Sequence, residues 1–235
     1  MNEKKSYKVQ IFEEQYVLVS DGPEAFVVKA AEIVFGIARH FSGLQFLDMG
    51  SGFKVAYKEG DVVTDVEDLG RKMTDAFNKF CASYGRDLEL WFEPGKFLVS
   101  ESGLLLVETT VVKEPPALTF VGVNSGLNHL IRPMMYGSYH GVQNISNPMG
   151  SEQEYNVVGY ICETDTFGSN LRLNEVRRGD LLAIRNAGAY CFSMSSNYNS
   201  RLRPAEILVH KGKPFLIRKR ETFEDLLRLQ VETEW

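Results

Sequence analysis

The sequence has 235 residues, of which 44% are hydrophobic and 24% charged, and its formal net charge is −5. This length and composition are typical of an ordinary globular protein with one large or two small domains. The acidic balance gives no reason to expect nucleic acid or an anionic membrane as a partner, and the longest apolar runs are far shorter than the ~20 residues that span a bilayer.

The cysteines and histidines do not predict a disulfide framework or a metal site. Cys81, Cys162 and Cys191 lie far apart and are odd in number, which suits the reducing cytoplasm. The four histidines show no paired spacing typical of zinc ligands. The N-terminus carries lysines without a following apolar run, so it does not resemble a signal peptide. We therefore expect a cytoplasmic protein without a metal.

The first 98 residues alternate between helices and short buried strands, and both strands end at glycine-containing turns. The spacing of apolar residues predicts two helices. Thr64 with Glu67 suggests a capping box at the start of the second helix, and Gly85 suggests its end. The elements are helices over Pro23–His40 and Asp65–Tyr84 and strands over Leu44–Met49 and Leu88–Phe92. This alternation predicts a parallel α/β arrangement with a site at the C-terminal ends of the strands.

From residue 99 to 235 the pattern changes to strands separated by Gly, Pro and Asn turns, typical of an antiparallel β domain. The expected strands are Leu104–Val112, Thr119–Val123, Asn156–Cys162, Leu181–Arg185, Ile207–His210 and Phe215–Arg218, with a short helix over Glu221–Leu229. A complete (β/α)8 barrel needs about 250 residues. Residues 1–98 can therefore supply only part of such a barrel.

Two loops follow the strands of the α/β part. Gly50-Ser51-Gly52 could present backbone N–H groups to a phosphate, although a tight turn is the simpler interpretation. Glu93, in the sequence Glu93-Pro94-Gly95-Lys96, places a carboxylate at a strand end, either to meet a cationic partner or as a solvated turn residue.

Two segments of the β part also carry polar chemistry. Cys162, beside Glu163, could donate a proton, but a small buried hydrophobe is the commoner fate of a lone cysteine. The stretch from Asn186 through Tyr190 to the sequence SMSSNYNSRLRP is rich in turns, as binding loops often are, and could equally be a solvated loop.

In order along the chain, these segments resemble the fold-type III pyridoxal-phosphate (PLP) decarboxylases. FLDMGSGFKVAY resembles the glycine loop of that family and WFEPGKFLV its EPGR motif, and NSGLNHLIRPMMYGSYH continues the likeness. ICET and GAYCFSMSSNYNSRLRPAE are similar to signatures of the diaminopimelate decarboxylases within it. The likeness covers roughly residues 20 to 230.

The resemblance implies a PLP enzyme of the cytoplasm. Its fold would be a (β/α)8 barrel, present here in part over residues 1–98, followed by a C-terminal β domain. The reaction would convert meso-diaminopimelate to L-lysine and carbon dioxide in lysine biosynthesis, with PLP as the electron sink. The family works as a homodimer with shared active sites.

The resemblance also implies a role for individual residues. Gly50, Ser51, Gly52, Glu93, Pro94, Gly95, Lys96 and Tyr190 would bind the cofactor, Glu93 at the pyridine nitrogen. Lys96, Arg132, Tyr136, Glu163 and Tyr190 would bind the substrate, and Cys162 would donate the catalytic proton across the dimer interface.

The sequence departs from the family pattern in several places. Ser51 stands where the family has glycine, Lys96 where it has arginine, Cys191 where it has glycine, and Asn124 where it has aspartate. Residues 1–20, with Lys4, Lys5 and Lys8, do not resemble the segment that carries the family's Schiff-base lysine. We therefore expect the chain to correspond to the C-terminal portion and to have little or no activity by itself.

Two alternatives remain open from the sequence. One is another decarboxylase of this fold, acting on carboxynorspermidine, ornithine or arginine. The other is a catalytically inactive homologue that serves as a binding or regulatory subunit.

Overall fold

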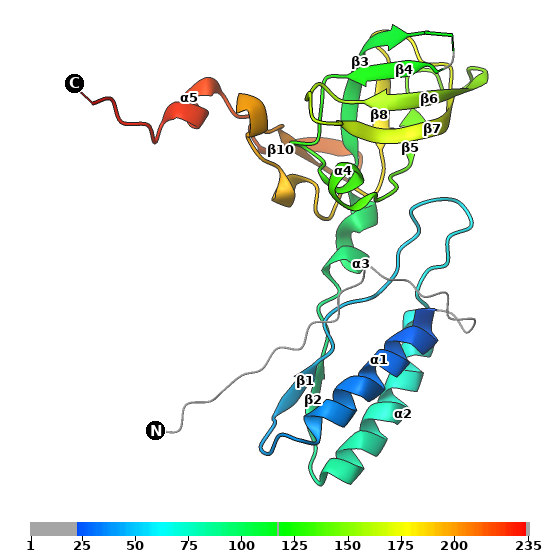
Figure 1. Ribbon diagram of the computed structural model, residues 1–235, viewed down its shortest axis with the longest axis vertical. Helices are drawn as coiled ribbons and strands as arrows, with labels where there is room; N and C mark the ends of the chain where they lie inside the picture. The colour runs from blue at the N-terminus through cyan, green and yellow to red at the C-terminus, as the bar shows by residue number, and fades with distance from the viewer. Residues whose placement is uncertain (1–22, 117, 234–235) are drawn as a thin grey trace. The chain divides into compact units, whose positions relative to one another are not determined.

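A computed structural model describes residues 23–116 and 118–233 of the chain (Figure 1). The chain divides into two compact units, Met1–Leu98 and Val99–Trp235. Among the described residues, no helix combines the length and apolarity needed to cross a bilayer.

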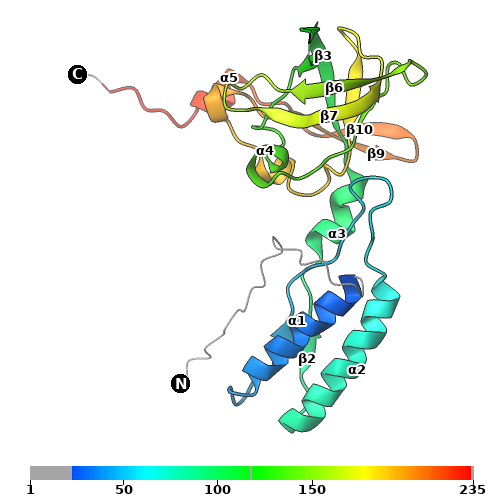
Figure 2. The same cartoon turned by 45° about the vertical axis from the view of Figure 1, so that its right-hand side comes forward.

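The first unit alternates helices and short strands. It contains α1 (Pro23–Ala38), β1 (Phe46–Asp48), α2 (Val66–Tyr84), β2 (Glu89–Trp91) and the start of α3 (Gly95–Val99). β1 and β2 pair in parallel with Leu47 opposite Leu90, because α2 carries the chain back between them. Figures 1 and 2 show α1 and α2 side by side next to this strand pair. The expected parallel α/β arrangement is confirmed, as part of a barrel.

Helix α2 shows how the apolar spacing forms the core of this unit. Leu69, Met73, Phe77 and Phe80 recur every three or four residues and are all buried. They pack with α1, where Phe35 stacks on Phe80 with 4.8 Å between the ring centroids. The apolar faces of α1 and α2 therefore pack against each other in the core of this unit.

The ends of α2 confirm one expectation and correct another. Gly85 ends the helix in the left-handed conformation at φ 86°. The expected N-cap, Thr64, is wrong: Asp65 is the cap, and its carboxylate accepts hydrogen bonds from the backbone N–H groups of Glu67 and Asp68. Thr64 is instead buried, and its hydroxyl accepts from the Lys54 N–H at 2.8 Å.

An Asp65→Ala substitution is expected to lower the free energy of unfolding by about 1 kcal/mol, because two N–H groups lose their acceptor. Urea unfolding followed by circular dichroism measures this loss. Glu67→Ala is the matched control, since it removes a first-turn carboxylate that does not cap the helix. Equal losses in both variants would contradict the assignment of the cap.

The second unit is built on a six-stranded sheet with the order β5-β8-β3-β4-β6-β7. Its strands are β3 (Leu105–Lys113), β4 (Phe120–Val123), β5 (Val142–Asn144), β6 (Glu152–Val158), β7 (Thr166–Asn174) and β8 (Leu181–Ile184). β5 and β7, the two edge strands, also contact each other, so the sheet is nearly closed (Figure 1). The predicted β domain is confirmed.

This sheet is mixed, which corrects the expectation of a purely antiparallel domain. β4 and β6 pair in parallel, with Val121 opposite Val157, whereas the other pairs in the sheet are antiparallel. The physical reason is the connection over residues 124–151, which contains α4 (Arg132–Tyr136) and β5 and is long enough for a crossover.

The inner face of the sheet holds the core of this unit. Along β3, Leu105, Val107 and Thr109 are buried while their neighbours are exposed, as the two-residue period of a strand requires. Leu105 and Val107 pack in one cluster with residues such as Val121 and Val157.

A separate hairpin and a short helix complete the second unit. β9 (Glu206–His210) and β10 (Lys213–Arg218) are antiparallel and joined at Lys211 and Gly212, both with positive φ. α5 (Phe223–Leu227) begins at Thr222, which forms a capping box with Asp225. The short helix expected near the C-terminus is confirmed.

Candidate functional site

The glycine loop follows β1 directly. Gly50 and Gly52 have φ values of 68° and 107°, which disfavour any side chain, whereas Ser51 does not have a positive φ. The Gly50 N–H donates to Asp48 Oδ1 at 2.8 Å. Among the described residues, none accepts a hydrogen bond from the N–H of Ser51 or Gly52. The loop therefore leaves two adjacent N–H groups for a ligand.

The loop after β2 lies against the glycine loop. The Glu93 N–H donates to the Gly50 carbonyl at 2.5 Å, so the parallel pairing continues two residues past the end of each strand. The Gly95 N–H donates to the Glu93 carbonyl at 2.8 Å, and α3 begins there with Lys96 in its first turn. Pairing of the parallel strands thus brings Gly50 to Glu93, although these residues lie far apart in the sequence.

In the second unit, three of the predicted substrate residues lie together: Arg132, Tyr136 and Tyr190. The guanidinium carbon of Arg132 lies 5.7 Å from the ring centroid of Tyr136 and 5.4 Å from that of Tyr190. Its Nη2 donates to Ser138 Oγ at 3.2 Å, whereas its buried Nε donates to no described residue. Both rings are about half exposed. The arrangement presents an oriented cation with spare donors, as recognition of a carboxylate requires.

Tyr190 reaches Arg132 because of its backbone. Its φ is 56°, an uncommon conformation for a large side chain, and it belongs to the predicted polar stretch after β8. The same stretch is fixed to the start of β3, since the Ala187 N–H donates to the Gly103 carbonyl and the Gly188 N–H to the Ser100 carbonyl. Strain at such a residue is common at binding sites.

Cys162 and Glu163 lie in a turn, whereas the sequence predicts Cys162 as the last residue of a strand. β6 ends at Val158, so the strand predicted over Asn156–Cys162 is wrong at its C-terminal end. Asp165 causes the early end: its carbonyl accepts from the Gly159 N–H and its Oδ2 from the Ile161 N–H, at 2.8 and 2.9 Å. Both predicted functional side chains are exposed as a result.

Asn199 is a neighbour of Cys162 that sequence reasoning missed. Its Nδ2 lies 3.9 Å from the Cys162 Sγ, within reach of a weak hydrogen bond to sulfur. It belongs to the stretch SMSSNYNSRLRP, which sequence analysis singled out as a polar loop without assigning a role to this asparagine.

Beside the turn, Tyr160 and His129 form a partly buried pair. The Tyr160 hydroxyl lies 3.4 Å from His129 Nε2, and Arg201 lies over the Tyr160 ring at 4.3 Å. Burial raises the pKa of Tyr160. Burial also lowers the pKa of His129, whose Nδ1 contacts Ser125 Oγ at 2.9 Å and whose Nε2 contacts the Leu202 carbonyl at 3.0 Å. The pair joins the turn to the polar loop.

The other two cysteines are buried. Cys191 donates to the His129 carbonyl at 3.3 Å, and burial raises its pKa to about 12. A thiol with such a pKa is not a ready proton donor or nucleophile at neutral pH. Cys162 is the exposed thiol among the three.

Buried histidines predict how stability depends on pH. Burial lowers the pKa of His140 from its ordinary value of 6.5, so the unfolded chain binds more protons than the folded chain just below that pH. Stability is therefore expected to fall as the pH falls from about 7 to about 5. Urea midpoints should show a smaller fall in a His140→Gln variant, while His210→Gln, at an exposed position in β9, keeps the full fall. A midpoint independent of pH in the unsubstituted chain would contradict this.

The predicted site residues thus form two groups, one in each unit. Gly50, Ser51, Gly52, Glu93, Pro94, Gly95 and Lys96 belong to the first unit, and Arg132, Tyr136, Cys162, Glu163 and Tyr190 to the second. Lys4, Lys5 and Lys8 lie outside the described residues. Within the described ranges, no group of three or more His, Cys, Asp or Glu side chains could hold a metal ion.

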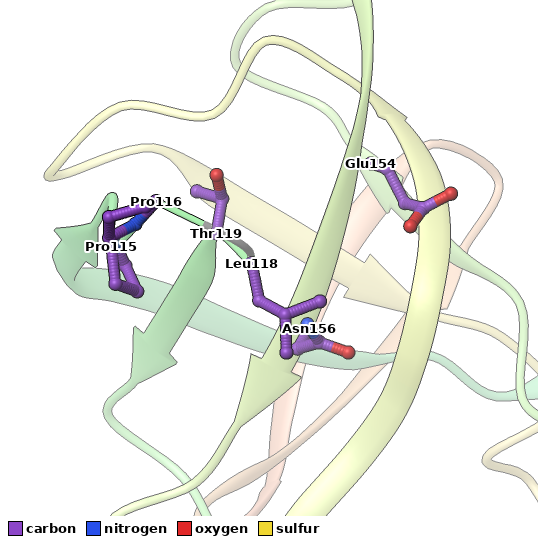
Figure 3. A pocket seen from close by; sticks show the side chains of 6 residues that line it. All are labelled: Pro115, Pro116, Leu118, Thr119, Glu154 and Asn156. Carbon is purple, nitrogen blue, oxygen red and sulfur yellow. The ribbon is translucent and has the colours of Figure 1, made fainter.

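A pocket of about 180 Å³ lies elsewhere in the second unit (Figure 3). None of the predicted site residues lines it. Its lining residues are Pro115, Pro116, Leu118, Thr119, Glu154 and Asn156.

The sequence matches the family model of the pyridoxal-dependent decarboxylases, C-terminal sheet domain, over residues 16–188. The diaminopimelate decarboxylase of Methanothermobacter thermautotrophicus is 41% identical over 216 residues, which cover 88% of this chain and 50% of that protein. The Escherichia coli K12 diaminopimelate decarboxylase is 38% identical, over 80% of this chain and 48% of its own length. The chain therefore spans about half the length of the curated relatives that it matches.

Solved structures give the same relationship. A crystal structure of a diaminopimelate decarboxylase matches with a TM-score of 0.80 and 35% identity, covering 88% of this chain and 52% of the other. The Helicobacter pylori diaminopimelate decarboxylase complexed with L-lysine matches with a TM-score of 0.74 and 33% identity, covering 90% of this chain and 51% of that one.

Proposed function

The chain belongs to the family of pyridoxal-dependent decarboxylases, and from this membership we propose that it acts in the conversion of meso-diaminopimelate to L-lysine and carbon dioxide. The observation that carries the proposal is the likeness to curated diaminopimelate decarboxylases along most of the chain. Residues 1–98 are proposed as the cofactor-binding part of the barrel and residues 99–235 as the C-terminal β domain.

The two loops of the first unit fit the cofactor. Gly50 and Gly52 have backbone conformations that suit glycine, and the N–H groups of Ser51 and Gly52, which bond to no acceptor in the described part of the chain, suit a phosphate. When bound, pyridoxal phosphate supplies an electron sink for the charge left on the substrate carbon. We propose that Gly50, Ser51 and Gly52 hold its phosphate.

Glu93 and its neighbours are proposed to hold the rest of the cofactor. The Glu93 carboxylate would keep the pyridine nitrogen protonated, because an anion favours the charged form of a nearby base. Pro94 and Gly95 form the turn that follows Glu93, and Lys96 adds a positive charge for an anionic group. Tyr190 is proposed as a further cofactor contact.

Substrate recognition is proposed for several charged and aromatic side chains. Arg132, oriented by the rings of Tyr136 and Tyr190, would bind a substrate carboxylate, and Lys96 would contribute a second cation. Glu163 would bind the distal ammonium group. A glutamate suits that group because its negative carboxylate attracts the positive ammonium.

Cys162 is proposed as the proton donor. Its exposed Sγ would transfer a proton to the substrate carbon that has lost carbon dioxide, and the nearby Asn199 amide would stabilise the thiolate left behind. As in the family that the sequence resembles, we propose a homodimer in which Cys162 acts in the active site of the partner. The free thiols are consistent with action in the cytoplasm.

Growth of a lysine-requiring bacterium that lacks diaminopimelate decarboxylase tests the proposed function. The test uses a chimera in which this chain replaces the matching half of the Methanothermobacter enzyme. We expect the chimera to restore growth without lysine, and the 235-residue polypeptide by itself to restore little or none. A stably expressed chimera that never restores growth would contradict the proposal.

A further inference from the structure

A single buried carboxylate links the Cys162 turn to the segment that precedes Arg132. Asp165 Oδ2 accepts the N–H of Ile161 at 2.9 Å, and Oδ1 accepts the N–H of Leu127 at 2.7 Å. Ile161 immediately precedes Cys162, and the segment from Leu127 leads into α4, which begins at Arg132. One side chain thus holds two segments that carry proposed functional groups.

Two glycines fix the position of this carboxylate. A Cβ atom at Gly159 or at Gly126 would overlap Asp165 Oδ2, so both positions exclude a larger residue. Asp165 is 7% exposed, and burial raises its pKa while the two N–H donors act in the opposite direction. Among the described residues, the donors to this carboxylate are the two backbone N–H groups, and together they hold the buried side chain in place.

The turn that Asp165 closes meets the polar loop at Asn199. The Asn199 Nδ2 lies 3.9 Å from Cys162 Sγ, and both Asn199 and Ser200 have a φ of 55°. Other charged or titratable groups on the segments that meet here are Glu163 in the turn, Tyr160 and His129 beside it, and Arg201 over the Tyr160 ring.

We propose that Asp165 is a positioning residue of the decarboxylase: its carboxylate fixes the turn so that the Cys162 thiol is held beside the Asn199 amide. This rests on the proposed role of Cys162 as proton donor. An amide N–H stabilises a thiolate that accepts from it, and an unfixed turn loses this contact. Asp165 touches neither substrate nor cofactor in this account.

Alkylation of Cys162 by iodoacetamide, followed by intact mass, tests the proposal on the 235-residue chain. Cys81 and Cys191 are buried, so one adduct forms while the chain is folded. Since Cys162 is already exposed, the alkylation rate reports the contacts that its sulfur makes more than access to it. Asp165→Asn and Asn199→Ala are each expected to slow alkylation at neutral pH about threefold, the effect of one modest hydrogen bond.

Asp180→Asn is the matched control. Asp180 is also 7% exposed, and its Oδ2 accepts from Asn144 Nδ2 and from the Arg177 N–H, both at 2.9 Å, in bonds that do not involve the Cys162 turn. Its loss is expected to leave the alkylation rate unchanged. The double variant of Asp165 and Asn199 is expected to be no slower than either single variant, because both act through one contact.

The proposal is overturned if Asn199→Ala alkylates at the parent rate, or if Asp165→Asn behaves like Asp180→Asn. Alkylation of all three cysteines would show that Asp165→Asn has unfolded. In that case two other measurements decide: alkylation of Asn199→Ala, and hydrogen exchange of the Leu127 and Ile161 N–H groups in the unsubstituted chain. Slower alkylation of Asn199→Ala together with slow exchange at both N–H groups supports the proposal. Unchanged alkylation, or fast exchange, overturns it. Growth of the chimera tests the decarboxylase function separately, so the two failures are distinguishable.

Discussion

A Cys162→Ala chimera is expected to form L-lysine about 10²- to 10⁴-fold more slowly than the unsubstituted chimera, because a positioned general acid contributes a factor of that order. The effect should fall on kcat and leave KM nearly unchanged, since Cys162 is exposed and contributes little to packing. Steady-state production of L-lysine from meso-diaminopimelate measures both constants.

Cys81→Ala is the control for this experiment. Cys81 is buried in α2, where its loss is expected to lower stability but not kcat. A Cys162→Ala chimera with a parent-like kcat would contradict the role of proton donor, whereas an equal loss of kcat in Cys81→Ala would attribute the effect to folding.

An Arg132→Ala chimera is expected to lose about 10- to 100-fold in kcat/KM for meso-diaminopimelate, mainly through KM. A charge-assisted hydrogen bond to a carboxylate is stronger than a neutral one, and Arg132 is already oriented by Tyr136 and Tyr190. Arg132→Lys should recover only part of the loss, because lysine keeps the charge but not the planar fork.

Arg172→Ala is the matched control, since Arg172 lies in β7 and pairs with Glu152 on an exposed surface at 3.0 Å. It is expected to leave kcat/KM unchanged. A parent-like KM in Arg132→Ala would remove this residue from the substrate site, and an equal rise in Arg172→Ala would indicate a nonspecific effect of charge.

Local patterns predicted the first unit well, because its elements are determined by neighbours in sequence. The spacing of Leu69, Met73 and Phe77 defines α2, and Gly85 ends it. The helix start was misassigned because Thr64 and Asp65 are both good caps, and only the burial of Thr64 against Lys54 decides between them.

Long-range pairing explains what the sequence could not predict in the second unit. β7 contains Gly168 and Asn170, the latter with a φ of 54°, so its alternation is interrupted and the strand was not expected. The parallel pairing of β4 with β6 depends on a crossover whose path has no local signal.

The candidate site was also predicted only in part from the sequence. The predicted residues were named from motifs, but the grouping of Arg132 with Tyr136 and Tyr190 depends on the positive φ of Tyr190. The role of Asp165 depends on Leu127, 38 residues earlier in the chain, and no local pattern indicates that contact.

Release of carbon dioxide from a panel of amino acids by the purified chimera is the most direct test of the account. The panel contains meso-diaminopimelate, carboxynorspermidine, L-ornithine and L-arginine, each assayed with added pyridoxal phosphate. We predict release from meso-diaminopimelate alone, with L-lysine as the product. Preferred release from any of the other three, or a folded chimera that releases none from meso-diaminopimelate, would contradict it.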